Sequence, residues 1–197
     1  SESGTNDDHA TQMVGTMRAR GVDADARGMA NAAEVEAYNW NNDIGEMAQA
    51  AADSLTGSAH PYAEIAGWTT SSTVCGSGYT WYSLESENPS KPYQFGYYNS
   101  QAQDWDSVAY LAPNYLIVKA AGNIRGIGPE SQPVKHWKID SNLNCFEDST
   151  SVRQINGGED GFESISGSSV SKNVLVVGAV QSSVNDFSVL SSIIPTD

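Results

Sequence analysis

Residues 115–123 read Tyr115-Leu-Ile-Val-Lys-Ala-Ala-Gly-Asn123, and this stretch indicates the fold class. An apolar, β-branched run that leads into Gly122-Asn123 is typical of a buried strand followed by a turn. Asn173-Val-Leu-Val-Val-Gly-Ala-Val180 reads as a second strand of the same kind. Continuous apolar strands are typical of parallel sheets that are covered on both faces.

Helical patterns alternate with these strands. Apolar spacing predicts helices over residues 11–20, 43–55 and 102–112, and the stretch 32–40 reads as a further short strand. We therefore predict an α/β fold of three layers, in which helices lie on both faces of a mostly parallel sheet. Three strands are expected to lie parallel in this sheet: Val35–Trp40, Tyr115–Ala121 and Val174–Val180.

Residues 1–197 read as a single domain with one insertion. The stretch 69–98 is rich in Gly, Ser, Thr, Trp and Tyr, and apolar and polar residues alternate over 79–84, which predicts an inserted β-hairpin region. Residues 124–161 are polar and rich in Gly and Asn, so we expect a long surface excursion there.

Composition excludes some classes of function. The chain has 24 acidic and 10 basic residues and a net charge of −14, which argues against a nucleic-acid partner. It contains no run of 18 apolar residues, so no membrane-spanning segment is expected. Abundant Gly, Asn and aromatic residues with little Lys favour a secreted protein, either extracellular or periplasmic.

The two cysteines, Cys75 and Cys145, leave two alternatives open. If they pair, they close a loop of about 70 residues, which stabilises the fold by about 4 kcal/mol in the chain-entropy model. Otherwise they are two separate thiols. Neither lies in a spacing that is typical of zinc ligands.

Three segments resemble blocks of the subtilisin-like serine peptidases (subtilases), and they occur in that family's order. Asp8-His-Ala-Thr-Gln-Met-Val-Gly-Thr16 is similar to the His-Gly-Thr-His-Val-Ala-Gly-Thr block, and residues 21–30 continue the match. The strand 115–123 resembles the one that ends in Ala-Ala-Gly-Asn, and 172–180 resembles Asn-Val-Ile-Thr-Val-Gly-Ala-Val. The resemblance implies a partial subtilase-like catalytic domain over residues 1–197, with 69–98 as its insertion.

The resemblance implies catalytic roles for His9 and Asn123. In the family mechanism a serine hydroxyl attacks the scissile carbonyl and a histidine acts as general base. His9 matches that histidine, and Asn123 matches an amide that donates to the oxyanion, worth roughly 3 kcal/mol in the transition state. Without the resemblance, His9 reads as an exposed residue at a helix start and Asn123 as a turn residue. We expect both to face one cleft at the carboxyl ends of the strands.

Other parts of the family machinery have no match in the sequence. No position matches the family's aspartate or its nucleophilic serine block, and Ser166-Gly-Ser-Ser169 reads as a flexible loop before the last strand. Pro61 and Ala63 stand where a substrate-lining Ser-x-Gly strand is expected, and Gln12 replaces a second histidine. We therefore expect the isolated chain to lack peptidase turnover. We also expect it to borrow a strand from another copy or to belong to a longer protein.

The leading hypothesis is a portion of a secreted subtilisin-like serine endopeptidase that acts on peptide or protein substrates. The alternative is a catalytically degenerate subtilase-like domain that binds peptides or protein partners. A structural calcium ion is considered because subtilases often carry one. Asp140-x-Asn142-x-Asn144 begins like a calcium loop, but Cys145 and Ser151 replace the required Gly and Glu, so metal ligands stay unassigned.

Overall fold

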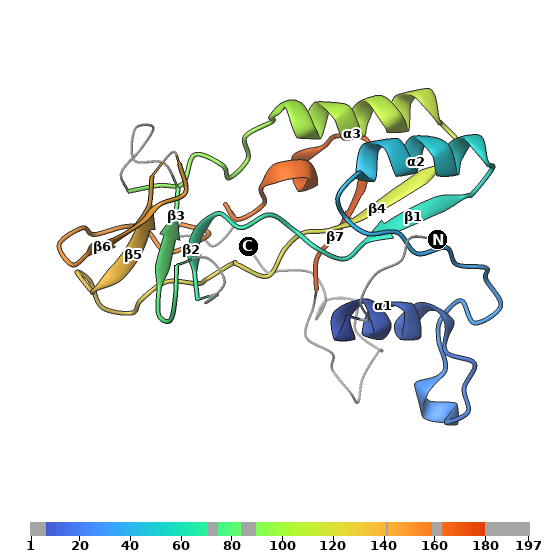
Figure 1. The fold of residues 1–197 in the computed structure, drawn as a ribbon, viewed down its shortest axis with the longest axis horizontal. Helices are drawn as coiled ribbons and strands as arrows, with labels where there is room; N and C mark the ends of the chain where they lie inside the picture. The colour runs from blue at the N-terminus through green and yellow to red at the C-terminus, as the bar shows by residue number, and fades with distance from the viewer. Residues whose placement is uncertain (1–6, 71–74, 84–89, 141, 159–162, 180–197) are drawn as a thin grey trace, which may run out of the picture.

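The computed structural model describes residues 7–70, 75–83, 90–140, 142–158 and 163–179, which form two β-sheets. Figure 1 shows the sheets toward opposite ends of an elongated molecule, with the α-helices beside one of them. Two short 3-10 helices, η1 (Ala24–Ala26) and η2 (Gly167–Val170), lie in the connections. The protein is therefore of mixed α/β class.

The first sheet is parallel throughout its described part. Its strands are β1 (Gly57–His60), β4 (Leu116–Ala120) and β7 (Leu175–Val177), in the order β1-β4-β7. The two apolar stretches singled out in the sequence are thus neighbouring parallel strands, as predicted, although residue 180 lies outside the described residues. Parallel neighbours need long crossover connections, and the helix between β1 and β4 belongs to such a connection.

Helices α2 (Asp43–Ala52) and α3 (Ser100–Leu111) lie along one face of this sheet (Figure 1). The Asn99 side chain caps α3 by accepting a hydrogen bond from the Ala102 amide at 2.9 Å, which satisfies one unpaired donor of the first turn. Trp105 is almost fully buried, so its replacement by alanine would cost about 3–5 kcal/mol. The hydrophobic core joins both helices to β4 through Met47, Ala50, Trp105, Val108, Tyr115 and Ile117.

The opposite face of the sheet is less covered. Helix α1 (Asp8–Arg18) lies on this side in Figure 1, and none of its residues is buried. Leu116, Leu175 and Val177 are each about half exposed. Among the described helices, α2 and α3 therefore supply the core of this sheet, whereas α1 adds no buried residue to it.

The described helices are short. They contain 11, 10 and 12 residues for α1, α2 and α3. None of the helices in the described part of the chain is long and apolar enough to span a membrane, which takes about 20 residues.

The second sheet has four strands: β2 (Gly67–Thr69), β3 (Thr80–Tyr82), β5 (His136–Ile139) and β6 (Cys145–Asp148). Its order is β2-β3-β5-β6, with antiparallel pairs at both sides and a parallel pair between β3 and β5. Trp68 and Trp81 are fully buried and their rings meet edge to face, with centroids 5.2 Å apart. Packing of these buried tryptophan rings therefore contributes to the core beside this sheet.

A buried ionic network supports the second sheet beside these tryptophans. The Arg153 guanidinium contacts the Asp148 carboxylate at 3.2 Å and lies 5.1 Å from the Trp81 ring centroid. Arg153 also donates through Nε to His136 Nε2 at 3.2 Å. Burial alone raises the pKa of Asp148, but hydrogen bonds from Ser151 and nearby backbone amides hold it well below its usual value.

One predicted strand is wrong. Residues 32–40 form turns and irregular backbone and are mostly exposed. The place beside β4 is taken by β1, whose Gly57, Ser58 and Ala59 are small and whose last residue is a histidine. Such a sequence lacks the β-branched run that usually signals a strand, because the core contacts here come from the neighbouring β4 and α2.

The predicted β-hairpin insertion 69–98 and the predicted surface excursion 124–161 both contribute strands to one sheet. An antiparallel pair does arise near the predicted insertion 69–98, between β2 and β3, although residues 71–74 and 84–89 lie outside the described part. The stretch 124–161 is not merely a surface excursion, since it contains β5 and β6. Single strands of three or four residues give too short a pattern to be read from the sequence.

Candidate functional site

The carboxyl ends of β1 and β4 bring three segments together. The segment 61–64 follows β1, residues 121–123 follow β4, and η2 bonds to Glu64 and to Ala120 at the end of β4. Gly122 has φ +108, and a Cβ built on it would lie 3.2 Å from the Ala63 side chain. This close approach and the positive φ explain the glycine, and they fix the loop after β4 beside the segment 61–64.

A chain of hydrogen bonds runs inward from this edge. The Tyr62 hydroxyl donates to the Asp43 carboxylate at 2.7 Å, so its oxygen is left to accept from His60 Nδ1 at 2.8 Å. His60 Nε2 then accepts from the Ser58 hydroxyl, also at 2.8 Å. We call Asp43, Ser58, His60, Tyr62 and Lys119 the β1 polar cluster.

Burial shifts the pKa values within the β1 polar cluster. His60 is 9% exposed and its ring meets Trp105 edge to face, and this desolvation lowers its pKa to about 4 against a weaker opposite effect of Asp43. Burial, and then the hydrogen bond to Asp43, raise the pKa of Tyr62 far above its usual value. His60 is therefore a neutral imidazole at pH 7, with a lone pair on Nε2.

Lys119 lies in the middle of the parallel sheet and is 1% exposed. Its ammonium donates to the Tyr62 carbonyl oxygen and lies 4.0 Å from the centroid of the Tyr62 ring and 5.4 Å from that of Trp105. Burial lowers the pKa of Lys119 to about 8, although Glu64 and Asp43 act in the opposite direction. The desolvation cost of the buried ammonium is thus offset by a carbonyl oxygen, two aromatic rings and nearby carboxylates.

Glu64 ties the segment 61–64 to η2. Its carboxylate accepts from the Ser168 amide at 3.1 Å, and its backbone carbonyl accepts from the Ser166 hydroxyl at 3.2 Å. The carboxylate occupies the space where a side chain at Gly167 would lie, and Gly167 has φ +59. Glycine is therefore required at this position both by its backbone angle and by its neighbour.

Asn123 is exposed, immediately beyond the loop that follows β4. Its side-chain amide has no hydrogen-bond partner among the described residues. An exposed amide at the carboxyl edge of a parallel sheet is chemically able to donate to a ligand oxygen. Its place in the chain agrees with the sequence expectation, whereas its catalytic role remains a prediction.

His9 is the second residue of α1 and is exposed, at the start of a helix whose N-cap is Asp7. The Asp7 carboxylate accepts from the Ala10 amide at 2.9 Å, so it is not bonded to the imidazole. In Figure 1 the dark-blue amino-terminal turn of α1 is drawn on the side toward which the parallel strands point. Within the described part of the chain, no hydrogen bond joins His9 to Asn123, and the expectation that they face one cleft stays a prediction.

The serines at residues 166–169 have structural partners. Gly167–Val170 form η2, and Ser166, Ser168 and Ser169 are buried. The Ser169 hydroxyl donates to the Ala120 carbonyl at 2.9 Å. The expected flexible loop is therefore a packed turn that fastens β4 and the segment 61–64 to the chain before β7.

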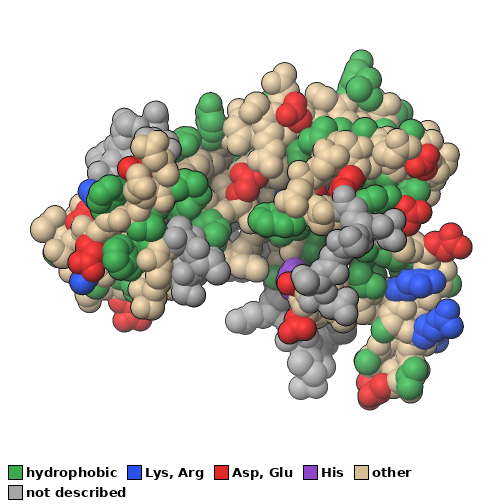
Figure 2. Space-filling view, in the orientation of Figure 1, with side chains coloured by type: hydrophobic (Ala, Val, Ile, Leu, Met, Phe, Trp, Pro, Cys, Tyr) green, Lys and Arg blue, Asp and Glu red, His purple; other side chains and the backbone are tan. Residues whose placement is uncertain are grey.

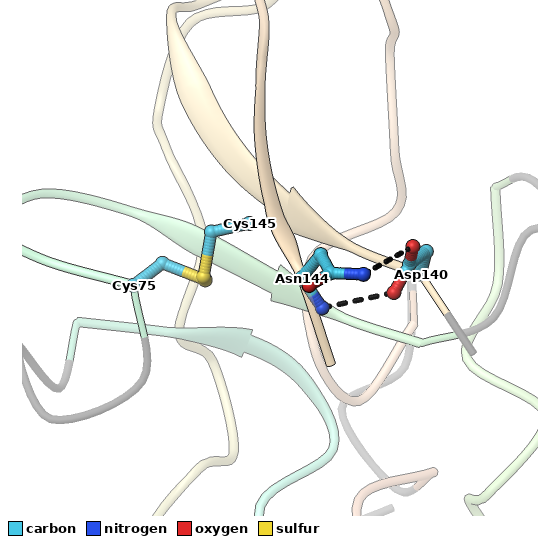
Figure 3. The surroundings of a disulfide bond; sticks show 4 residues. All are labelled: Cys75, Asp140, Asn144 and Cys145. Atoms are coloured by element: carbon cyan, nitrogen blue, oxygen red, sulfur yellow. Dashed lines mark hydrogen bonds between the residues drawn. A yellow bond between two sulfur atoms is a disulfide. The ribbon is translucent and has the colours of Figure 1, made fainter. Parts of the chain in front are cut away.

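The candidate calcium loop holds its own turn instead of presenting open ligands. Figure 3 shows Asp140 beside Asn144, whose side-chain amide donates to the Asp140 carboxylate at 3.0 Å, and the backbone amides of Asn142 and Asn144 donate to it at 2.8 Å. These bonds, that of the Asn144 side chain first, lower the pKa of Asp140. Among the described residues no group of three or more His, Cys, Asp or Glu side chains is placed to hold a metal ion.

The two cysteines next to this turn are bonded. Cys75 precedes β3 and Cys145 begins β6, and Figure 3 shows the disulfide that joins them over a separation of 70 residues. The paired alternative is therefore the observed one. The bond joins the chain before β3 to β6, two parts of the second sheet that are distant in the sequence.

Asp106 on α3 is buried, whereas Asp104 on the same helix is exposed. The Asp106 carboxylate accepts from the Tyr98 hydroxyl at 2.6 Å and from the backbone amides of Lys172 and Asn173. Burial alone raises the pKa of Asp106, but these donors together lower it. A shallow hollow of about 420 Å³ beside it is lined by Tyr98, Gln103, Asp106, Tyr110, Lys172 and Asn173.

Acidic side chains are spread over the face shown in Figure 2 and do not gather at one site. Sequence reasoning missed four residues at the carboxyl edge: Asp43, His60, Tyr62 and Lys119. Their stretches read as a helix, as the place of a substrate-lining strand and as an apolar strand. A lysine within an apolar run was the one signal of a buried charge.

Comparisons with protein-family models, with curated proteins and with solved structures find no match.

Proposed function

We propose that this chain is a portion of a secreted subtilisin-like serine endopeptidase, and that its parallel sheet with helices on both sides is a subtilisin-like three-layer core. The observation that carries the proposal is the position of Asn123. It follows the central strand of the parallel sheet, beside the segment 61–64. Ligands of open parallel α/β sheets bind at this edge.

In the proposed mechanism His9 removes the proton of a serine hydroxyl as that hydroxyl attacks the scissile carbonyl. The Asn123 amide donates to the oxygen that becomes negative, which stabilises the transition state by roughly 3 kcal/mol. The serine and the aspartate of the family have no match here, so the complete site needs residues that this sequence does not supply. The substrates are peptides or proteins in an extended conformation.

A disulfide favours the proposed secreted location. Disulfides persist in oxidising compartments and are rare in the cytosol. The bond between Cys75 and Cys145 is therefore consistent with an extracellular or periplasmic protein.

A catalytically degenerate domain that binds peptides is the second candidate. Pro61 has no backbone N–H and Ala63 carries a Cβ, where the family pattern has Ser and Gly. A Cβ built on Gly122 would lie 3.2 Å from the Ala63 side chain, so there is little room between the two loops. These features favour a site that holds a peptide less closely than an active peptidase does.

Three tests bear on these proposals. Fluorescence anisotropy with fluorescein-labelled casein, an unfolded polypeptide, should show saturable binding to the purified chain but no cleavage. The sequence of the parent gene on both sides then separates the candidates, because an Asp-x-Gly strand before His9 and a Gly-Thr-Ser-x-Ala block after residue 197 belong to a peptidase. A serine-reactive phosphonate should label the longer protein, and His9→Ala should abolish the labelling. The absence of both casein binding and labelling would contradict the proposal.

A further inference from the structure

The segment 61–64 connects the first sheet to the second and would be free to move if nothing held it. It lies outside regular strands, and the backbone groups of Pro61 and Ala63 have no hydrogen-bond partner among the described residues. Fixing a segment whose backbone is unpaired costs conformational entropy. Contacts within the protein that fix the segment before a ligand arrives remove that cost from the binding step.

Tyr62 supplies these contacts in the middle of the segment. Its hydroxyl bonds both to Asp43 on α2 and to His60 on β1. Its carbonyl oxygen accepts from Lys119 on β4, and its ring lies 4.0 Å from the same ammonium. Three secondary-structure elements therefore fix one residue through its hydroxyl, its ring and its backbone.

We propose that Tyr62 is the positioning residue of the peptide-binding segment 61–64, and that Asp43, His60 and Lys119 hold it in place. This inference rests on the proposed function, since it assumes that the segment lines the peptide site. Tyr62 acts through the backbone of its neighbours and touches no substrate. By reducing the freedom of the segment before binding, it lowers the entropic cost of binding.

Other features of the cluster agree with a positioning role. The Ser58 hydroxyl and His60 form a pair with nucleophile-and-base geometry, but Ser58 lies in a strand and faces the layer of α2 and α3. The series of hydrogen bonds that runs from Ser58 through His60 and Tyr62 ends at Asp43, the first residue of α2. The hydrogen bonds thus link a helix start to the segment, which is what a support for that segment requires.

The test compares Tyr62→Phe with the matched control Tyr38→Phe. Tyr62→Phe removes the two hydroxyl bonds and keeps the ring and the carbonyl. Tyr38 also donates to a carboxylate, that of Glu36 at 2.6 Å, but in an exposed loop. We expect Tyr62→Phe to weaken the binding of fluorescein-labelled casein about tenfold, and Tyr38→Phe to leave it unchanged.

A second pair of variants separates positioning from general stability. Asp43→Asn keeps an oxygen that accepts from the Tyr62 hydroxyl, so casein binding should stay within about threefold of wild type, whereas Asp43→Ala should lose about as much as Tyr62→Phe. Urea unfolding checks that each variant is folded under the binding conditions. Casein binding by Tyr62→Phe at the wild-type level would overturn the proposal.

Limited proteolysis distinguishes failure of this inference from failure of the proposed function. In Tyr62→Phe a nonspecific protease should cleave within residues 61–66 at least about tenfold faster, while α3 keeps its resistance. If the wild-type chain does not bind casein, the proposed function fails, and faster cleavage confined to 61–66 still supports Tyr62 as the residue that positions the segment. Unchanged cleavage there overturns the positioning role in either case.

Discussion

His60 and Lys119 are single residues that make the stability of this fold depend on pH. Both are buried against Trp105 at the carboxyl side of the parallel sheet. An apolar residue at either position would fill the space without a desolvation cost. The ionisable side chains instead bind Tyr62. Their desolvation lowers the stability of the fold, and in the proposed role they hold the segment 61–64 in place.

We predict that acid destabilises the protein through His60. The folded-state pKa of about 4 lies below the usual value of 6.5, so the unfolded chain binds more protons between these values. Stability is therefore retained above about pH 6.5 and is lost as the pH falls toward about 4, by on the order of 3 kcal/mol.

Urea unfolding at about pH 7 and about pH 4.5 measures this loss. His60→Gln should reduce the difference in unfolding free energy between the two pH values, and His9→Gln, which replaces an exposed imidazole, is the matched control. An equally large acid loss in His60→Gln would contradict the prediction.

We predict that Lys119 makes the free energy of unfolding depend on pH in the alkaline range. Its pKa of about 8 in the folded state lies below the usual value of 10.5, so the folded protein releases its proton at a lower pH than the unfolded chain does. The unfolding free energy should therefore rise as the pH increases from about 8 to about 10. Lys119→Met should abolish this rise in urea unfolding, and a rise of the same size in that variant would refute the assignment.

Among helices and strands, the join between α3 and the segment before β7 depends on Asp106. Asp106→Ala leaves the amides of Lys172 and Asn173 and the Tyr98 hydroxyl without their acceptor. We expect a loss of about 3 kcal/mol in the free energy of unfolding, because a charged acceptor of several hydrogen bonds is removed. Asp104→Ala, an exposed neighbour on the same helix, should change stability by less than about 0.5 kcal/mol.

The second sheet depends on its disulfide. Replacement of both Cys75 and Cys145 by serine should lower the free energy of unfolding by about 4 kcal/mol, because a loop of this length then keeps its full chain entropy when unfolded. Trp68 and Trp81 lie in this sheet, so tryptophan fluorescence during urea unfolding reports the change. Wild type treated with a reductant should match the double variant, and the double variant should not respond to the reductant.

Much of the fold, though not its second sheet, could be predicted from the sequence. Long apolar patterns gave β4, β7 and the helices, since core burial imposes the period of each element on its residues. β1 could not be read in this way, because Gly57, Ser58 and Ala59 owe their strand conformation to pairing with β4. Asn123 was placed correctly at a strand end, whereas the β1 polar cluster depends on contacts between residues up to 57 positions apart.

Among the described residues, one face of the parallel sheet is apolar and about half exposed, and we predict that it associates with a second copy. Leu116, Leu175 and Val177 lie about half exposed on the face opposite α2 and α3, and within the described residues β1 and β7 each have one neighbouring strand. Exposed apolar faces and unpaired strand edges promote association. Sedimentation velocity at about 100 µM should show dimers or larger species that dissociate on dilution. Val177→Lys should reduce association, whereas Val152→Lys, at an exposed valine outside the sheets, should not. A wild-type chain that stays monomeric at that concentration would show that this face needs no partner copy.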